Sequence, residues 1–283
     1  MMQPSRYHGS RVALLTRHGK GGVIAPVLEP ELGCLIELVT GFDTDLLGTF
    51  TRETPRSGTQ LAAARCKARK GMELAGRSQG IASEGSFGLD PYAGVVPWNV
   101  ELLVWIDDEA GIEVVGIAQG EARSGHIHSG DWLEVADFAQ REGFPEHQLV
   151  LRPDDESATR ICKDIADWST LKTCFDSCLA QSGSATVFVE LDLRAFANPT
   201  RMKLIEQAAA DLLQRLQSTC PVCVTPGFWI SERRPGLPCA ACRLPTPAYL
   251  SEVWTCVGCQ HRRIAKRTDR SAADPALCAY CNR

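Results

Sequence analysis

The stretch ELLVWIDDEAGIEVVGIA, residues 101–118, carries the pattern that decides the fold of the first part of the chain. Two runs rich in β-branched and apolar residues, 101–107 and 112–118, flank a short polar turn. Runs of this kind, joined by so few residues, predict two antiparallel strands of one hairpin. A sheet that contains this hairpin is not purely parallel, so we expect a mixed sheet.

Strand-like and helix-like runs alternate around this hairpin. The other runs bounded by Gly, Pro or Asp that predict strands are 12–16, 34–40, 148–152 and 186–191. Apolar residues recur at the three- and four-residue steps of amphipathic helices in 61–75, 131–142, about 157–181 and about 201–217. The sum predicts an α/β domain in which helices flank a mixed sheet.

The composition changes near Ser218, where the helical periodicity stops. The chain has 283 residues and thirteen cysteines, and eight of these cysteines follow Ser218 as four CxxC pairs. A length above about 200 residues favours two domains. We therefore predict an α/β domain at 1–217 and a Cys-rich metal-binding module at 218–283.

The four CxxC pairs have the spacing of zinc ligands. They are Cys220 with Cys223, Cys239 with Cys242, Cys256 with Cys259, and Cys278 with Cys281. Each CxxC turn points two sulfurs at one centre, and two turns complete a tetrahedral zinc site, so eight thiolates predict two closed, structural zinc ions. Two partitions fit the spacing: neighbouring pairs share a zinc, or 239/242 and 256/259 form a zinc ribbon nested inside a site made by 220/223 and 278/281. We favour the nested partition.

Charge is distributed unevenly along the chain. From Leu216 onward the formal charge is +5, whereas residues 1–215 carry −9. The basic run HRRIAKRTDR, 261–270, lies among aromatic residues, a combination that suits phosphate contacts and base stacking. Two Zn²⁺ ions with eight thiolates would carry −4 and lower the charge of this segment to about +1. Nucleic-acid binding through 261–270 is therefore one interpretation, and a solvated charged loop is the other.

Hydropathy gives no sign of a membrane protein. The longest apolar runs, such as 100–106, have only the length of a strand. We expect no membrane span and a cytoplasmic protein.

Several motifs in order carry a resemblance to a known family. They are RHGK (17–20), DTDLLGTF (43–50), ASEGSFG (82–88), NVELL (99–103) and GFPEH (143–147), followed by the CxxC array. With these motifs the chain resembles a bacterial family catalogued as a domain of unknown function, number 6671. This resemblance covers nearly the whole chain and implies no activity.

A more distant resemblance concerns the N-terminal part. The order VALLTRHGK, AARCKA (63–68) and IASEGSFG (81–88) is similar to that of inosine triphosphatase-like nucleoside triphosphate pyrophosphatases. The resemblance implies a phosphate loop with Thr16 and His18, a helix lysine at Lys67, and an acidic turn at Glu84. The sequence departs from that family because His18 and Ala63 replace its asparagines, Lys20 falls one place early, and no acid follows the loop at the metal-binding position.

Glu84 is the centre of our functional hypothesis. A carboxylate in a turn of small residues at a strand end can approach Mg²⁺, and Asp43 or Asp45 could complete the metal site. Lys67, Lys20 and Thr16 would then orient the phosphates of a nucleotide or another phosphorylated small molecule. We expect a Mg-dependent phosphoanhydride hydrolase with a structural zinc module. The alternative is a non-enzymatic zinc-ribbon adaptor that binds nucleic acid or a protein.

Overall fold

The computed structural model describes residues 5–42 and 58–282. It divides into two compact units, Met1–Ile106 with Val115–Leu213, and Asp107–Val114 with Gln214–Arg283. The boundary near Ser218 that the sequence suggests stays a prediction. No helix among the described residues is long and apolar enough to cross a membrane.

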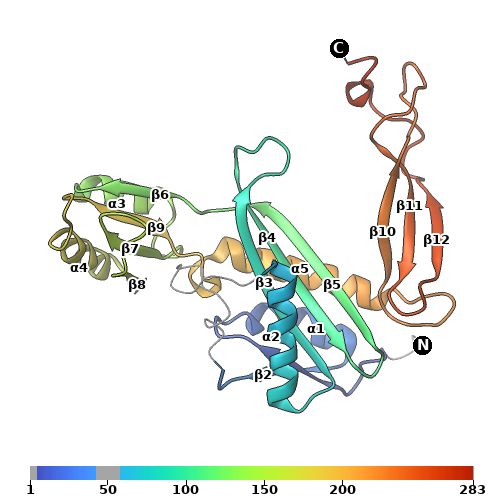
Figure 1. Cartoon of the computed structure of the whole chain (residues 1–283), viewed down its shortest axis with the longest axis horizontal. Helices are drawn as coiled ribbons and strands as arrows, with labels where there is room; N and C mark the ends of the chain where they lie inside the picture. Colours follow the sequence, from blue (N-terminus) through green and yellow to red (C-terminus); the bar gives the residue numbers. More distant parts are fainter. Residues whose placement is uncertain (1–4, 43–57, 283) are drawn as a thin grey trace. The chain divides into compact units, whose positions relative to one another are not determined.

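A five-stranded sheet in the order β2-β1-β3-β4-β5 forms the centre of the first unit (Figure 1). Its elements are β1 (Arg11–Leu15), α1 (Gly21–Leu32), β2 (Leu35–Val39), α2 (Gln60–Ala75), β3 (Gln79–Leu89), β4 (Pro97–Asp107) and β5 (Ile112–Glu121). β1 pairs in parallel with β2 and with β3, whereas β3, β4 and β5 follow one another as hairpins. The mixed sheet expected from residues 101–118 is thus confirmed.

Helices cover both faces of this sheet. β1 connects through α1 to β2, which lies on one side of it, and β2 connects through α2 to β3, which lies on the other side of β1. The two crossovers run in opposite directions, so right-handed connections place α1 and α2 on opposite faces of the sheet. Small residues let α2 approach the sheet closely: a Cβ on Gly80 would lie 2.4 Å from Met72 Cγ, and Ala64 and Ala68 are fully buried. Helix α5 (Pro199–Gln217) packs at Gly116 of β5, where a Cβ would lie 2.5 Å from the Ala208 carbonyl oxygen.

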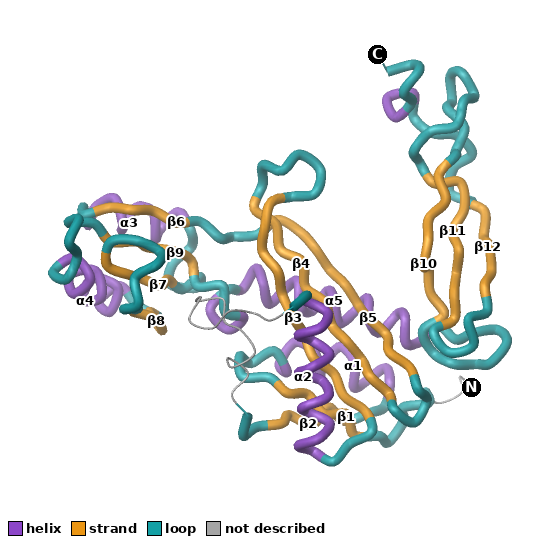
Figure 2. Tube along the Cα trace, viewed as in Figure 1, coloured by secondary structure: helices purple, strands orange, loops and turns teal. Residues whose placement is uncertain are grey.

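The first unit contains a second sheet, which the sequence did not separate from the first (Figure 2). Its strands, in the order β6-β9-β7-β8, are wholly antiparallel. The elements are β6 (His126–Ser129), α3 (Trp132–Arg141), β7 (Leu149–Pro153), β8 (Cys162–Ile165), α4 (Trp168–Leu179) and β9 (Val187–Leu191). The core residues Phe138, Leu149 and Phe175 belong to this sheet and its two helices.

The helix predicted at about 157–181 is too long. Residues Cys162–Ile165 form the edge strand β8, and α4 begins only after Asp167, whose side chain accepts from the Thr170 N–H. An N-cap of this kind fixes the start of a helix and blocks its extension backwards.

The second unit contains a three-stranded antiparallel sheet. It is formed by β10 (Phe228–Pro235), β11 (Tyr249–Cys256) and β12 (Arg262–Lys266), in that order. The four CxxC turns lie before β10, between β10 and β11, between β11 and β12, and after β12. Few large apolar side chains are buried between residues 214 and 282. The expected combination of an α/β fold with a small cysteine-rich module is confirmed.

Candidate functional site

The loop after β1 opens the candidate site of the first unit. Residues 16–20 connect β1 to α1, and Lys20 is the N-cap residue of α1. A pocket of about 400 Å³ lies at the carboxyl ends of the parallel strands β1 and β2, lined by Thr16, Arg17, Val39, Thr40, Gly41 and Phe42. Ligands of open α/β sheets bind at this edge, where strand ends and helix N-termini meet.

Lys20 is a buried lysine. Its Nζ donates to the main-chain carbonyl of Ser83 on β3 at 3.3 Å. Burial, and after it the guanidinium of Arg201, lowers the pKa of Lys20 to about 7, although the carboxylates of Glu101 and Glu84 act in the opposite direction. A lysine that titrates near neutral pH can exist in either protonation state when a ligand arrives.

Glu84 and Lys67 form an ion pair beside Lys20. Lys67 Nζ on α2 contacts Glu84 Oε1 on β3, and only 12% and 4% of the two side chains are exposed. The side-chain amide of Gln60, at the start of α2, donates to the carbonyls of Glu84 and Val100 at 2.7 and 2.8 Å. Gln60 therefore links the start of α2 to β3 and β4 beside Glu84.

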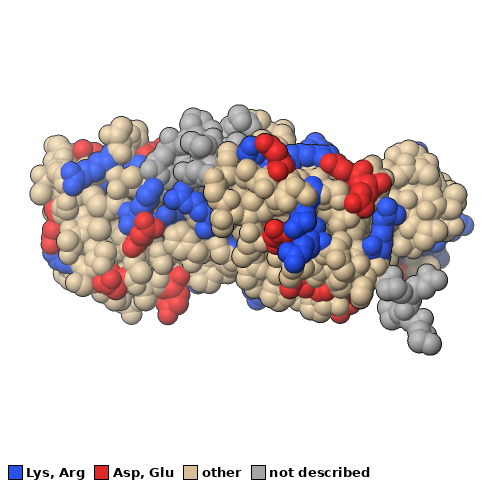
Figure 3. Space-filling model, turned by 90° about the horizontal axis from the view of Figure 1, so that it is seen from below, with Lys and Arg blue, Asp and Glu red and all other residues tan. Residues whose placement is uncertain are grey.

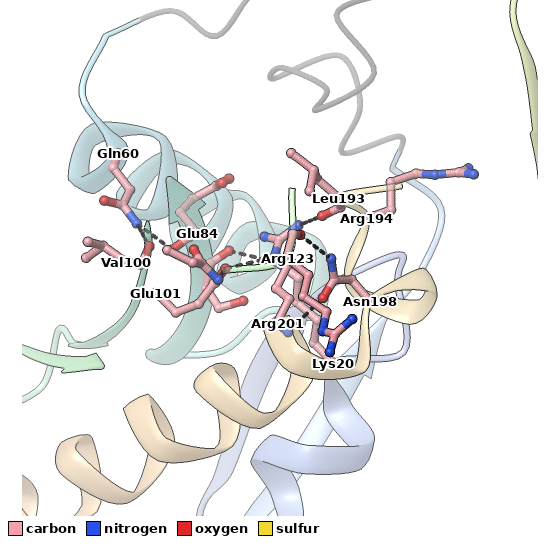
Figure 4. A network of polar contacts seen from close by, with 12 residues as sticks. Lys20, Gln60, Glu84, Val100, Glu101, Arg123, Leu193, Arg194, Asn198 and Arg201 are labelled. Atoms are coloured by element: carbon pink, nitrogen blue, oxygen red, sulfur yellow. Dashed lines mark hydrogen bonds and ion pairs between the residues drawn. The ribbon is translucent and has the colours of Figure 1, made fainter. Parts of the chain in front are cut away.

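A second buried ion pair joins Glu101 and Arg201. Arg201 Nε donates to Glu101 Oε1 at 2.7 Å, and Asn99 Nδ2 donates to the same oxygen at 3.2 Å. Glu101 is 0% exposed and Arg201 2%. Gly85 makes room for this pair, because a Cβ there would lie 2.1 Å from Glu101 Oε1. Figure 4 shows Lys20, Glu84, Glu101 and Arg201 gathered in one cluster.

Arg201 is held in place by the side chain of Asn198 and the main chain of Leu193. Its own N–H donates to Asn198 Oδ1 at 3.0 Å, and its Nη1 donates to the Leu193 carbonyl at 2.5 Å. Asn198 Nδ2 in turn donates to the Arg123 carbonyl at 3.2 Å. The two connections between the five-stranded and four-stranded sheets, around 123 and 193–198, thus position the guanidinium.

We call the four buried side chains Lys20, Glu84, Glu101 and Arg201, together with the mostly buried Lys67, the charged cluster. With all five ionised it carries a net charge of +1. Among the residues that the structure describes, the buried oxygens Ser83 Oγ, Asn99 Oδ1 and Glu101 Oε2 have no hydrogen-bond partner. A buried site of this composition can balance the charge of an anion and still offer carboxylate oxygen to a hard cation.

The structure brings together some of the residues that the sequence proposed. Glu84, Lys67 and Lys20 meet in the charged cluster, and Thr16 lines the pocket after β1. The His18 ring stacks on Phe196 with ring centroids 5.5 Å apart. Asp43 and Asp45 lie outside the described residues.

The prediction that Glu84 lies in a turn at a strand end is wrong. β3 runs without interruption from Gln79 to Leu89, so Glu84 lies at its middle. β1 pairs with β3 only at Gly80 and Ile81, so near Gly85 and Gly88 the neighbour of β3 in the sheet is β4.

Sequence reasoning missed Glu101 and Arg201. Glu101 had a readable signal, since it is a carboxylate inside an otherwise apolar strand run. Arg201 had none, because an arginine in the first turn of an amphipathic helix is usually exposed.

The four CxxC pairs of the second unit share one turn geometry. The N–H groups of Val224, Arg243, Gln260 and Asn282 donate to the carbonyls of Cys220, Cys239, Cys256 and Cys278, respectively, at 2.9 to 3.2 Å. Val224, Arg243 and Gln260 also adopt positive φ angles of 62°, 66° and 62°. Main-chain N–H groups point at the sulfurs, as when Gly258 N donates to Cys256 Sγ at 3.3 Å. These turns hold each pair of sulfurs toward one point.

The cysteines form two groups, and the partition corrects our expectation. Cys220, Cys223, Cys256 and Cys259 converge on one centre, and Cys239, Cys242, Cys278 and Cys281 converge on another. The first pair thus shares a centre with the third and the second with the fourth, so both the nested partition and the partition by neighbouring pairs are wrong. The pairing of β10 with β11 is the physical reason, because it places Phe228 opposite Cys256 and so brings the turn before β10 to the end of β11.

The distances between sulfurs suit zinc and exclude disulfides. Between different pairs, Sγ atoms lie 3.6 Å apart for Cys223 and Cys256 and 3.9 Å apart for Cys239 and Cys281. Four sulfurs about 2.3 Å from a tetrahedral centre lie about 3.8 Å from one another. The two groups could therefore hold two zinc ions.

The first half of the basic run 261–270 contains strand β12, and several of the charges in the run have partners. Arg267 donates to Asp269 at 2.6 Å and stacks 4.0 Å above the Tyr249 ring, and Arg262 contacts Glu232 at 3.3 Å. The guanidinium of Arg263 lies 5.3 Å from the Phe228 ring centroid. Figure 3 shows Lys and Arg side chains interspersed with Asp and Glu on one face of the molecule.

Comparison with known proteins identifies one family. A family model described as Domain of unknown function (DUF6671) matches residues 66–283. Neither the curated proteins nor the solved structures gave a match. Residues 66–283 include the paired cysteines and four members of the charged cluster, whereas Lys20 precedes them. The resemblance to inosine triphosphatase-like enzymes stays a prediction.

Proposed function

The chain belongs to the DUF6671 family, and we propose that its first unit is a hydrolase domain for nucleotide phosphoanhydrides, with the charged cluster as its reaction centre. The second unit carries two structural zinc ions in this proposal.

The observation that supports this function is that four buried charged side chains and the mostly buried Lys67 meet in one place from five segments. Buried ion pairs are poor stabilisers, because the loss of hydration offsets most of their attraction, and apolar residues of similar volume usually serve a fold as well or better. A cluster with a strongly perturbed lysine therefore points to a function other than stability.

Each residue of the charged cluster has a role in this proposal. Lys20, Lys67 and Arg201 balance the phosphate oxygens, and Thr16 and the main chain before α1 orient them. Glu84 and Glu101 offer oxygen atoms for a divalent cation such as Mg²⁺, the metal that hard carboxylate ligands favour. When bound, that cation would supply charge neutralisation and a more acidic water.

The test is phosphate release from a panel of nucleotides with Mg²⁺, including purine triphosphates with altered bases. Glu84→Gln keeps the shape of the side chain and removes its charge, so we expect activity to fall by orders of magnitude. Glu73→Gln is the matched control, because Glu73 is exposed on the same helix as Lys67. If no nucleotide is hydrolysed and none raises the melting temperature, the proposal is wrong.

A second candidate is a non-enzymatic zinc adaptor that binds nucleic acid or a protein through the second unit. The exposed side chains of Arg262, Arg263 and Lys266 on β12 favour it. Alanine at these three positions should then abolish binding of single-stranded RNA or DNA, and the affinity of the unmodified protein should fall steeply with salt. Binding that ignores salt, or no binding, removes this candidate.

A further inference from the structure

Three cysteines of the first unit lie outside the CxxC pairs and are in contact through their sulfur atoms. Cys162 belongs to the strand β8, and Cys174 and Cys178 lie one turn apart on α4. The Cys178 thiol donates to Cys162 Sγ at 3.9 Å, and the Cys174 thiol is also hydrogen-bonded to Cys162. We call these three side chains the thiol triad.

Packing alone would explain a single buried cysteine, because its side chain behaves as a small apolar group. The thiol triad does pack on the core of the second sheet, in which Cys178 is fully buried with Leu171 and Phe175. Three thiols that a fold holds together can also act as one chelating group with a high effective concentration. The thiol triad therefore has a chemistry that none of its members has alone.

A small ligand can reach the thiol triad from solvent. Cys162 and Cys174 are partly exposed, whereas Cys178 is buried. The strand order β6-β9-β7-β8 places Cys162 on the edge strand of its sheet (Figure 1). A ligand can thus react first with Cys162 or Cys174 and then with the buried Cys178.

The surroundings of the thiol triad favour an uncharged ligand over a metal cation. Burial raises the pKa of Cys178 to about 12 and that of Cys174 to about 11, and the neighbouring Cys162 adds to both shifts. These two thiols are therefore protonated at neutral pH, and a metal cation would have to displace their protons. Three thiolates around a monovalent or divalent cation would also leave net negative charge against an apolar core, which is costly.

The number of sulfurs points in the same direction. In each zinc group four sulfurs lie within 4.8 Å of one another, and the thiol triad is not among the described groups of that compactness. Tetrahedral zinc needs four ligands. A trivalent atom that forms three covalent bonds to sulfur is satisfied by three thiols, and partly exposed side chains can adjust to bring them together.

We propose that the thiol triad is a binding site for trivalent arsenic, which it takes up as uncharged arsenous acid. Three As–O bonds of As(OH)₃ break and three As–S bonds form, while the three thiol protons leave with the three hydroxyl groups as water. No electron is transferred, arsenic stays trivalent, and the product is uncharged, as an apolar core requires. This site is separate from the charged cluster and does not depend on the hydrolase function.

Native mass spectrometry of the reduced, full-length, zinc-loaded protein with sodium arsenite tests the site. We expect each chain to gain one arsenic atom and to lose three hydrogen atoms, with both zinc ions retained. Arsenic that enters only as zinc leaves would belong to the second unit and would overturn the proposal. A third zinc ion held by the thiol triad, or a disulfide in place of bound arsenic, would overturn it as well.

Alanine variants locate the arsenic. Cys162→Ala and Cys174→Ala each remove one of the three As–S bonds, so arsenite should bind at least about tenfold more weakly to either variant. Cys66→Ala is the matched control, because Cys66 is an exposed cysteine on α2, and it should leave the affinity unchanged. If both triad variants bind arsenite as tightly as the unmodified protein, the site is wrong.

Alkylation of the unmodified protein gives the same information should a variant fail to fold. Bound arsenic should protect Cys162 and Cys174 from iodoacetamide in peptide maps, whereas Cys66 should react at the same rate with and without arsenite. Unchanged alkylation of Cys162 and Cys174 in arsenite-treated protein would refute the proposal.

Discussion

The group of Cys220, Cys223, Cys256 and Cys259 takes its four ligands from two short turns, whereas the charged cluster takes five side chains from five segments between residues 20 and 201. In the first case the residue spacing within each turn already fixes half of the site. In the second case only the sheet and its helices bring the side chains together. The ligands of the cysteine group can therefore be recognised from residues close together in the sequence, whereas the members of the charged cluster are brought together only by the complete fold.

The two units also differ in how their folds should respond to the loss of a site. The cysteine-rich unit has few large buried apolar side chains, so we expect its fold to depend on metal. The first unit has apolar cores of its own, among them one under α2 and one between α3, α4 and the second sheet. We expect metal loss to unfold the second unit and charge loss to perturb the first.

Cys256→Ser should have the largest effect on stability of the variants considered. If it left the second unit folded, the contrast between a metal-dependent unit and a unit with its own cores would be wrong. Cys256 is fully buried at the end of β11, and structural zinc contributes about 10–16 kcal/mol of apparent free energy in small zinc modules. The variant should lose one zinc ion per chain by elemental analysis and lose amide protection in β10 and β11. The amides of β1 and β3 should stay protected, and equal loss of protection there would show that the two units do not fold separately.

Arg201→Met probes the cost of an orphaned buried charge. Glu101 is 0% exposed, so removing its guanidinium partner should reduce the free energy of unfolding of the first unit by about 3–5 kcal/mol. Chemical unfolding followed by hydrogen exchange measures it. The double variant Arg201→Met with Glu101→Met should recover much of the loss, since no charge is then left alone. If the double variant is as unstable as the single one, packing and not charge accounts for the effect.

Lys20→Met should change the stability of the first unit in a way that depends on pH. The pKa of Lys20 is lowered to about 7 in the folded protein and is near 10.5 when unfolded, so between these values the unfolded state binds more protons. Lys20 therefore destabilises the fold at and below pH 7, and this cost shrinks as pH rises toward 10. Lys20→Met should raise the free energy of unfolding by about 2–4 kcal/mol at pH 7 and progressively less at pH 8 and 9. The exposed Lys163→Met should show no such trend, and a trend of equal size in both variants would contradict the assignment.

Gly85→Ala compares two glycines of one strand. A Cβ at Gly85 would meet Glu101 Oε1 and the Arg201 Nη2 atom, whereas a Cβ at Gly88 has nothing within 4 Å. We expect Gly85→Ala to lower the stability of the first unit by about 1–3 kcal/mol, as overpacking does, and to weaken pyrophosphate binding. Gly88→Ala should leave both unchanged. Equal effects of the two variants would mean that the strand, and not the ion pair, requires glycine.

The limits of sequence reasoning follow the same division between local and global features. The hairpin at 101–118 and the eight paired cysteines were readable, because strand alternation and CxxC spacing act over a few residues. The partition of the cysteines was not, since it depends on Phe228 pairing with Cys256 across β10 and β11. Helix α1 escaped prediction because Pro26 and Pro30 lie inside it. Arg201 escaped because its partner lies 100 residues away along the chain.

The smallest expected effect concerns Arg267, and it separates a structural charge from a binding charge. Its guanidinium bonds to Asp269 at 2.6 and 2.9 Å and lies 4.0 Å from the Tyr249 ring centroid. The carboxylate of Asp269 holds the pKa of Arg267 above its ordinary value, so the charge is permanent. Arg267→Ala should lower the stability of the second unit slightly, because the side chain loses its bonds to Asp269 and its cation–π contact with Tyr249. Lys266→Ala, at the neighbouring exposed position, should cost less than half as much by urea unfolding. If the zinc adaptor function holds, Lys266→Ala should weaken RNA binding more than Arg267→Ala does. Lys266 is exposed, whereas Arg267 is bound to Asp269 and Tyr249 of the same unit.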